Sequence, residues 1–387
     1  MKRILDRDRT TDTAHAVPAR TPARTPARLR ALLASLLCVS ALAHAQSAPV
    51  VAHDDGPYVR ISGNTLTAEW ICDGKPSQRT RHLRRRAVTL PPRCAYPDTI
   101  RIPSVEAPEQ AEVVQGVDKL AVISDLHGQF DLAVRLLQAN GVIDAERRWS
   151  FGRGHLVVVG DCFDRGTRVT EVLWLLYGLQ QQARLAGGDV NVVLGNHETM
   201  TLQGDLRYLN EKYADIATAM GRPYPALYGE DTVLGRWIRR LPVMLKIDGM
   251  LFVHGGISPE YLAQGLDMAA ANAAYRGSLG FDKDRIQRDP VLRALYDGKS
   301  SPIWYRGYFE DPVLSDAQVD DLLARLGVSR IVVGHTSMQR IESRYGGKVI
   351  AVDTSIKNGQ NGEVLLIEGT RLQRGTLQGE RLPLEAD

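Results

Sequence analysis

The stretch Gly160-Asp161-Cys162-Phe163-Asp164-Arg165-Gly166 directly follows an apolar run at residues 156–159. A continuous apolar run that ends in Gly-Asp is typical of a buried parallel strand whose carboxyl end opens into a loop. In α/β sheets, the loops at these ends carry the binding and catalytic side chains. The stretch therefore predicts an α/β sheet with a functional site at one edge, to which it contributes two carboxylates and a guanidinium.

Four other apolar runs end in polar residues in the same way. Because the carboxyl ends of neighbouring strands meet at one edge of a sheet, we expect these polar side chains to converge on Asp161. Carboxylate, amide oxygen and imidazole groups in such number are typical of a site for two metal ions. The runs at residues 120–124, 190–194, 250–253 and 330–333 lead into Asp125-Leu126-His127, Gly195-Asn196-His197-Glu198, His254-Gly255-Gly256 and Gly334-His335.

Asp161 is the expected ligand between the two ions, because an aspartate can bridge two cations through its two oxygens. Each short motif alone occurs by chance, but five in chain order favour one common site over isolated structural residues. We expect two divalent or trivalent ions, of manganese, iron or zinc. The expected ligands are Asp125 and His127 on one ion, Asp161 between the two, and Asn196, His254 and His335 on the other.

The N-terminal segment resembles an export signal. An apolar run at residues 31–43 is too short to span a bilayer, follows basic residues, and ends in Ala43-His44-Ala45, a small-x-small cleavage pattern. We therefore predict a signal peptide over residues 1–45 and a periplasmic or secreted mature protein with no membrane anchor. A buried N-terminal helix and an uncleaved anchor are the alternatives.

The basic charge of the chain belongs to this predicted signal peptide. The full sequence has a formal net charge of +3, and residues 1–45 carry eight Lys/Arg and three Asp/Glu. Residues 46–387 therefore have a formal net charge of −2. A nearly neutral mature chain gives no reason to expect nucleic acid as a partner.

Residues 46–116 differ in character from the rest of the chain. Short β-type pieces and turn residues predict a β-rich N-terminal extension, and the basic run 79–86 is expected to be a solvated surface loop. In an oxidising compartment, Cys72 and Cys94 could form a disulfide, with two free thiols as the alternative. The extension is expected to pack on the domain that follows.

From residue 117 to residue 387, strand-like runs alternate with helical patterns, which predicts one domain with helices on the faces of its sheets. Residues 199–241 interrupt this pattern because they contain no strand signal. They predict a helical insertion over the site, with helices at 202–220 and 232–240. Such an insertion could be a wall or lid over the site, or a purely structural excursion.

These motifs resemble the calcineurin-like metallophosphoesterase superfamily, which carries Asp-x-His, Gly-Asp-x-x-Asp-Arg-Gly, Gly-Asn-His-Glu, His-Gly and Gly-His in this order. The Asp-Arg-Gly and His-Glu forms are typical of its phosphoprotein phosphatase branch. Within that branch, residues 302–307 (Pro-Ile-Trp-Tyr-Arg-Gly) and 351–356 (Ala-Val-Asp-Thr-Ser-Ile) are most similar to bacterial Shewanella-like phosphatases. The resemblance covers residues 120–357 and implies an α/β/β/α sandwich.

The charges and the resemblance together predict hydrolysis of phosphomonoesters. A hydroxide that bridges the two metals is expected to attack phosphorus in line. Arg165 and, second, Arg306 are expected to bind the phosphate, because a guanidinium matches it in a bidentate way. His197 is expected to protonate the leaving oxygen, with Asp164 orienting its imidazole. Glu198 is expected to support these groups.

The expected substrates are phosphorylated proteins, peptides or small phosphomonoesters, with phosphotyrosine ahead of phosphoserine or phosphothreonine. A phosphodiesterase or dinucleoside polyphosphate hydrolase is the second enzymatic hypothesis, because relatives on this fold also perform that chemistry. The presence of both Asp164 and His197 favours the monoesterase. A periplasmic phosphate- or metal-binding protein that has lost catalysis is the non-enzymatic alternative.

Overall fold

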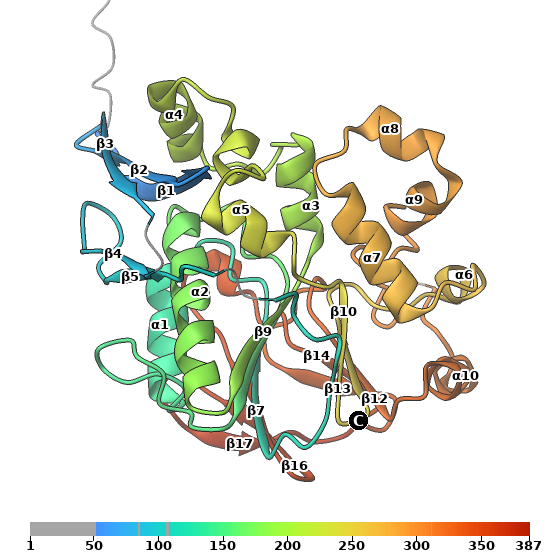
Figure 1. Ribbon diagram of the computed structural model, residues 1–387. Coiled ribbons are helices and arrows are strands. Elements are labelled where there is room, and N and C mark those ends of the chain that lie inside the picture. The colour runs from blue at the N-terminus through green and yellow to red at the C-terminus, as the bar shows by residue number, and fades with distance from the viewer. Residues whose placement is uncertain (1–51, 84–85, 106–107, 311) are drawn as a thin grey trace, which may run out of the picture. The chain divides into compact units, whose positions relative to one another are not determined.

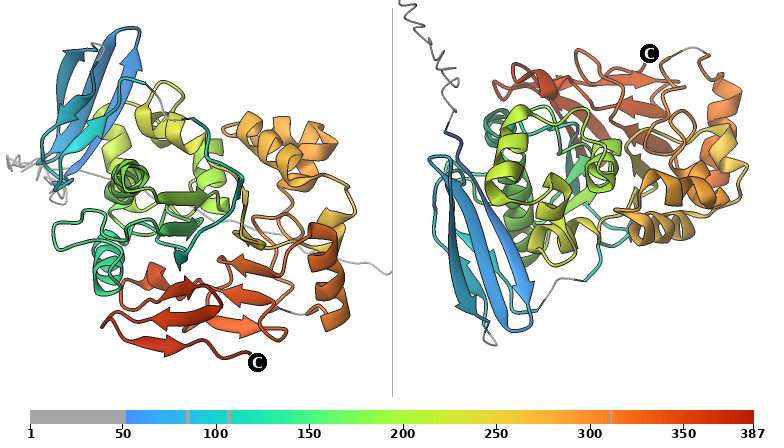
Figure 2. Two further views of the ribbon diagram at one scale, coloured as in Figure 1. Left: turned by 60° about the horizontal axis from the view of Figure 1, so that its bottom comes forward. Right: turned by 90° about the horizontal axis from the view of Figure 1, so that it is seen from above.

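Two six-stranded sheets form the centre of the protein (Figures 1 and 2). The computed structural model describes residues 52–83, 86–105, 108–310 and 312–387, so the predicted signal peptide lies outside the described residues. The first sheet has the order β17-β16-β15-β7-β8-β9 and the second β13-β14-β12-β11-β10-β6. Their strands are β6 (Val113–Val114), β7 (Lys119–Ile123), β8 (His155–Val159), β9 (Asp189–Val193), β10 (Met244–Ile247), β11 (Met250–Val253), β12 (Arg330–Val333), β13 (Glu342–Arg344), β14 (Val349–Ala351), β15 (Val364–Glu368), β16 (Arg371–Gly375) and β17 (Arg381–Pro383).

An apolar layer fills the space between the two sheets. Leu120 and Val122 of β7 belong to this layer together with Phe252 of β11, whereas Ala121 and Ile123 belong to the core on the opposite face of β7. Successive side chains of a strand point to opposite faces, so a strand buried on both faces is apolar throughout. This is why the central strands are continuous apolar runs in the sequence.

Helices cover the outer faces of both sheets and complete the predicted α/β/β/α architecture (Figure 1). Within the described residues, no helix is both long enough and apolar enough to cross a bilayer. The first sheet is covered by α1 (Phe130–Ala139) and α2 (Val169–Leu185), and α10 (Asp316–Leu326) lies beside the second sheet. The group of short helices α6 (Pro259–Leu262), α7 (Met268–Ser278), α8 (Lys283–Arg288) and α9 (Pro290–Leu295) lies above that sheet in the view of Figure 1.

The described part of the N-terminal extension is rich in β-structure, as predicted. An antiparallel sheet contains β1 (Asp55–Ser62), β2 (Thr65–Cys72) and β3 (Lys75–His82), and a second pair contains β4 (Val88–Leu90) and β5 (Ile100–Ile102). A disulfide joins Cys72 to Cys94. The boundary at residue 116 stays a prediction, and β6, which lies before it, pairs with β10 of the main domain.

The expectation of a loop over the basic run 79–86 is wrong for residues 79–82, which lie on β3. This strand pairs with β2 along its whole length, from Thr65 opposite His82 to Cys72 opposite Lys75. Its side chains are largely exposed, so backbone pairing holds it and no apolar alternation marks it in the sequence. Charged residues on such an edge strand discourage pairing with other chains.

The helical insertion contains four short helices where two were expected. Residues 202–220 do not form one helix, because Gly204 adopts φ 84° and ends α3, and the Asn210 side chain caps the start of α4. Residues 204–210 between these helices are therefore irregular. The helices are α3 (Asn196–Gln203), α4 (Glu211–Met220), η1 (Tyr224–Tyr228) and α5 (Val233–Ile238).

A buried polar network joins the extension to the insertion. Lys212 of α4 lies 2.6 Å from the carboxylate of Asp55 in β1, which is fully buried. Lys212 also donates to the Thr167 carbonyl at 2.7 Å, just before α2. The nearby Glu171 is 2% exposed and pairs with Arg168 at 3.0 Å. Burial, and then the charge of Asp55, raises the pKa of Glu171 to about 7.

Glu171→Gln is expected to remove a pH-dependent part of the stability. Because the folded-state pKa of Glu171 lies above its ordinary value of 4.5, its contribution is fully present below about pH 4.5 and is lost as pH rises through about 7. As pH rises from about 5 to about 8, the wild type should therefore lose stability that the variant keeps. The free energy of unfolding of the variant should rise relative to that of the wild type by roughly 2–3 kcal/mol over this range. Denaturant titrations at several pH values measure this difference, and a constant difference would contradict the assignment.

Candidate metal centre

The strand ends bring the six expected metal ligands to one edge of the sandwich. Asp125 and His127 follow β7, Asp161 follows β8, and Asn196 opens α3 directly after β9. His254 follows β11 and His335 follows β12, so both sheets contribute. The exposed fractions of these six residues are 1% for Asp125, 1% for His127, 2% for Asp161, 1% for Asn196, 0% for His254 and 5% for His335.

Several of these residues adopt a backbone conformation that non-glycine residues rarely adopt. The φ angle is 52° at Asp125, 42° at His127, 56° at Asp161 and 62° at His335. Such left-handed conformations cost energy and persist where the surroundings enforce them, which is common at functional sites. Backbone hydrogen bonds between the loops enforce them here, since the N–H groups of Asp125 and His127 donate to Gly160 and Asp161 carbonyls at 3.1 and 2.9 Å.

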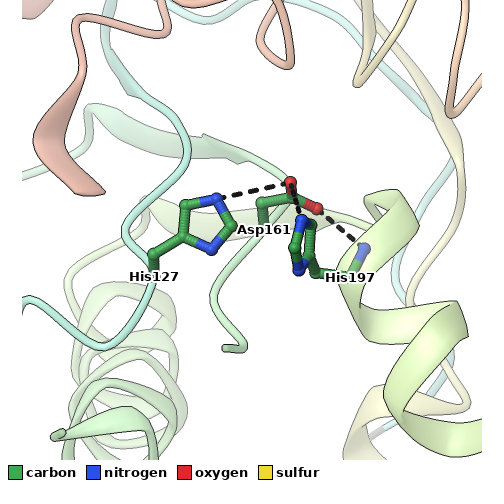
Figure 3. A group of neighbouring side chains, drawn as sticks. All are labelled: His127, Asp161 and His197. Atoms are coloured by element: carbon green, nitrogen blue, oxygen red, sulfur yellow. Dashed lines mark hydrogen bonds and ion pairs between the residues drawn. The ribbon is translucent and has the colours of Figure 1, made fainter. Parts of the chain in front are cut away.

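The Asp161 carboxylate lies at the centre of the site (Figure 3). Its Oδ2 atom is 3.2 Å from Nε2 of His254 and 3.6 Å from Nε2 of His127. Two groups of potential ligand atoms, each within 4.8 Å of one another, share this residue. One group contains His127, Asp161 and His197, and the other contains Asp161, His254 and His335. An aspartate shared by two clusters is the arrangement expected of a bridging ligand.

Backbone carbonyls orient the imidazoles toward this centre. Nδ1 of His127 lies 2.6 Å from the Phe163 carbonyl, and Nδ1 of His254 lies 2.7 Å from the Val159 carbonyl. A bond of this kind fixes the tautomer with Nδ1 protonated and leaves Nε2 free to ligate a metal. The side-chain oxygen of Asn196 is also within 3.0 Å of Nε2 of His254.

The pKa shifts of the buried side chains show that the site favours positive charge. Burial works to raise the pKa of Asp161, but the surrounding imidazoles, His254 most of all, hold it well below its usual range. Burial works to lower the pKa of His254, but Asp161 and then Asp125 raise it to about 10. Burial lowers the pKa of His127 to about 3. A divalent cation would supply the positive charge that a proton on His254 otherwise provides, so this donor set fits metal ions.

His197 and Asp164 form a pair beside the centre. Nδ1 of His197 lies 2.6 Å from the Asp164 carboxylate, and its Nε2 lies 3.8 Å from Oδ2 of Asp161. Both side chains are nearly fully buried. The distances also place His197 among the potential metal ligands. Its bond to Asp164 suits a proton donor, because a carboxylate stabilises the protonated imidazole.

The two arginines expected to bind phosphate lie next to different residues of the site. Arg165 is exposed, follows Asp164, and places its guanidinium 4.8 Å from the ring centroid of Tyr208. Arg306 is half-buried and donates to the His335 carbonyl at 2.8 Å. The ring of Trp304 also lies 5.5 Å from that of His335.

Tyr208 was missed in the sequence because it lay inside the helix expected over residues 202–220. Its ring centroid is 5.1 Å from that of His197, so it borders the site. The signals that mark its segment are Gly204, a residue that commonly ends helices, and Asn210, a preferred helix cap. Both were present in the sequence.

Glu198 holds the loop that carries Asp161. Its carboxyl oxygens accept hydrogen bonds from four backbone N–H groups, which is why this loop and the start of α3 stay together. The donors are Asp161 at 3.0 Å, Cys162 at 2.6 Å, Phe163 at 3.3 Å and Gly195 at 2.7 Å.

The geometry agrees with comparisons to known proteins. The family model for calcineurin-like phosphoesterases matches residues 119–338. The chain belongs to this family. The phosphoesterase is also similar to a cold-active protein-tyrosine phosphatase of a psychrophilic Shewanella species, whose crystal structure is 41% identical, has a TM-score of 0.80, and covers 86% of this chain and 100% of that chain.

Curated relatives point in the same direction. Shewanella-like protein phosphatase 2 of Arabidopsis thaliana is 26% identical over 289 residues, which cover 62% of this phosphoesterase and 72% of that protein. A symmetrical bis(5′-nucleosyl)-tetraphosphatase of Chromobacterium violaceum is 28% identical over 170 residues, which cover 41% and 53%. The protein is therefore a metallophosphatase of the phosphoprotein phosphatase branch, as its motifs predicted.

Glu198→Ala is expected to destabilise the phosphoesterase, because it leaves buried N–H groups of the Asp161 loop without an acceptor. The free energy of unfolding should fall by about 3 kcal/mol or more, and less in Glu198→Gln, which keeps one acceptor oxygen. Denaturant unfolding measures this change, and metal analysis should show reduced metal content in the alanine variant. Wild-type stability of Glu198→Ala would contradict the role assigned to the carboxyl group.

Asp161→Asn and His197→Asn are expected to separate metal binding from proton transfer. The first should lose both metal ions and all activity, since it removes the shared ligand. The second should keep its metals and lose about 10²- to 10⁴-fold in kcat, which is typical of a missing general acid. Elemental analysis beside initial rates tests both, and metal-free His197→Asn would assign that histidine to the metals instead.

Proposed function

We propose that the phosphoesterase is a dimetal phosphomonoesterase that acts on phosphorylated proteins or peptides and prefers phosphotyrosine over phosphoserine and phosphothreonine. The observation that carries this proposal is the His197–Asp164 pair, which lies beside a carboxylate shared by two candidate metal clusters. The similar Shewanella enzyme is described as a protein-tyrosine phosphatase, which supports the substrate class. Manganese, iron and zinc are the metals we propose, because oxygen and imidazole ligands suit all three.

Each side chain has a distinct part in the proposed mechanism. Asp125, His127, Asp161, Asn196, His254 and His335 would hold two metal ions. When bound, these ions would lower the pKa of water and withdraw charge from the phosphate. Arg165 and Arg306 would bind the non-bridging phosphate oxygens. His197 would donate the proton on Nε2 to the leaving oxygen, while Asp164 holds its Nδ1.

Hydrolysis of a dinucleoside polyphosphate is the second candidate, favoured by the similarity to the Chromobacterium violaceum tetraphosphatase. That similarity covers 41% of the chain, less than half of the share covered by the Shewanella structure, which is 86%. The acid pair of His197 and Asp164 suits an alkoxide or phenoxide leaving group, which must be protonated as it departs. We therefore favour the phosphomonoesterase over the dinucleoside polyphosphate hydrolase. A binding protein that has lost catalysis is the least favoured of the three hypotheses.

We also propose that the protein is exported after cleavage of residues 1–45 and works as a periplasmic or secreted enzyme without nucleic acid or a membrane as partner. The disulfide between Cys72 and Cys94 supports this proposal, because such bonds persist in oxidising compartments.

Initial rates on four substrates test the function. Protein that begins at residue 46 should hydrolyse a phosphotyrosine peptide and a phosphoserine peptide faster than bis(p-nitrophenyl) phosphate or diadenosine tetraphosphate, and chelation should abolish the activity. Dominant turnover of the diester or the dinucleotide would replace the proposal with the second candidate. Absence of any turnover by protein that contains metal would favour a binding protein.

A further inference from the structure

An exposed aromatic side chain, Tyr208, lies beside both the candidate acid and the exposed candidate phosphate ligand. It is 40% exposed, whereas Tyr213, which follows in α4, is buried. Its ring centroid is 5.1 Å from that of His197, and the guanidinium of Arg165 lies 4.8 Å from the ring centroid. An aromatic ring kept at the surface beside two functional groups is available to a substrate.

The segment that carries Tyr208 is fixed to the site loop. The Arg165 N–H donates to the Tyr208 carbonyl at 3.0 Å, and the Asn210 amide donates to the Arg165 carbonyl at 2.9 Å. Arg207, whose guanidinium is 5.7 Å from the ring centroid, is itself paired with Asp205 at 2.8 Å. The ring is therefore held in place before substrate arrives, which reduces the ordering cost of a contact.

The acid defines where the leaving group lies. Nδ1 of His197 is engaged by Asp164 at 2.6 Å, so only Nε2 can deliver a proton. The leaving oxygen must come within hydrogen-bond reach of Nε2. The carbon attached to that oxygen then lies next to the His197 ring, which Tyr208 also borders.

We propose that Tyr208 forms a wall of the leaving-group site and selects aryl over alkyl phosphomonoesters. The proposal rests on the phosphomonoesterase function above and identifies a residue that distinguishes one leaving group from another. In the reaction, water attacks phosphorus, and the bond from phosphorus to the phenol oxygen breaks. That oxygen takes its proton from Nε2 of His197, and the proton released by the water balances it, so the products are a phenol and inorganic phosphate.

The preference follows from the shape of the two leaving groups. Phosphotyrosine places an aromatic ring directly beyond the leaving oxygen, where the exposed part of Tyr208 can contact it. Phosphoserine places a single methylene there, followed by the peptide backbone. A contact between two aromatic rings is expected to favour the aryl ester by about two- to tenfold in kcat/KM.

Two peptides of identical sequence, one with phosphotyrosine and one with phosphoserine, test this proposal. Tyr208→Leu should lower the ratio of their kcat/KM values by about two- to tenfold. Tyr208→Phe is the matched control and should keep the wild-type ratio, because among the described residues the Tyr208 hydroxyl makes no hydrogen bond. Tyr208→Gln, a polar non-aromatic variant, should behave like Tyr208→Leu.

Inhibition by inorganic phosphate separates this contact from a merely structural one. Phosphate has no leaving group, so its inhibition constant should stay the same in Tyr208→Leu. A constant that weakens together with both kcat/KM values would mean that Tyr208 only positions Arg165, and would overturn the proposal. An unchanged ratio in both non-aromatic variants would overturn it as well.

The test also separates this inference from the function on which it rests. Wild-type protein that hydrolyses neither peptide would refute the proposed function. Wild-type protein that hydrolyses both, with a ratio indifferent to the residue at position 208, would refute only the role of Tyr208.

Discussion

The buried carboxylate of Asp161 is the constraint on which the site depends. An ionised group away from water is costly unless positive charge and hydrogen-bond donors surround it. The backbone N–H of His197, which follows the first sheet, donates to this carboxylate at 3.0 Å, and the imidazole of His254, which follows the second sheet, lies 3.2 Å from it. These groups can meet only because the two sheets pack face to face with their carboxyl ends aligned. The packing of the two sheets therefore allows the charge of the buried Asp161 carboxylate to be balanced.

The site divides into a buried part and an exposed part. The candidate metal ligands are nearly inaccessible, and carbonyls or carboxyls behind them fix their orientation. Arg165 and Tyr208 lie at the surface and are attached to the site through backbone hydrogen bonds between loops. The candidate metal ligands are therefore held inside the core, whereas the side chains proposed to contact the substrate lie at the surface on a segment that is fixed to the site loop.

The sequence predicted the parts of the structure that leave a pattern in it. Strands β7, β8 and β11 are buried and largely apolar on both faces, and candidate ligands follow each of them, so these strands and ligands could be recognised. Strand β3 could not, because its side chains face solvent and backbone pairing alone defines it. The left-handed backbone at Asp161 and the four bonds to Glu198 depend on loops distant in sequence. Tyr208 was hidden by a helical pattern that the Gly204 break interrupts.

The Asp55–Lys212 ion pair has a consequence for the dynamics of the molecule. Breaking a buried ion pair leaves a charge inside the protein without a partner, so the extension and α4 cannot separate without a large cost in free energy. Because Lys212 also donates to the Thr167 carbonyl, one side chain connects the extension to the loop that follows Arg165. The N-terminal sheet and the loop at the rim of the site are therefore energetically coupled through the Lys212 side chain.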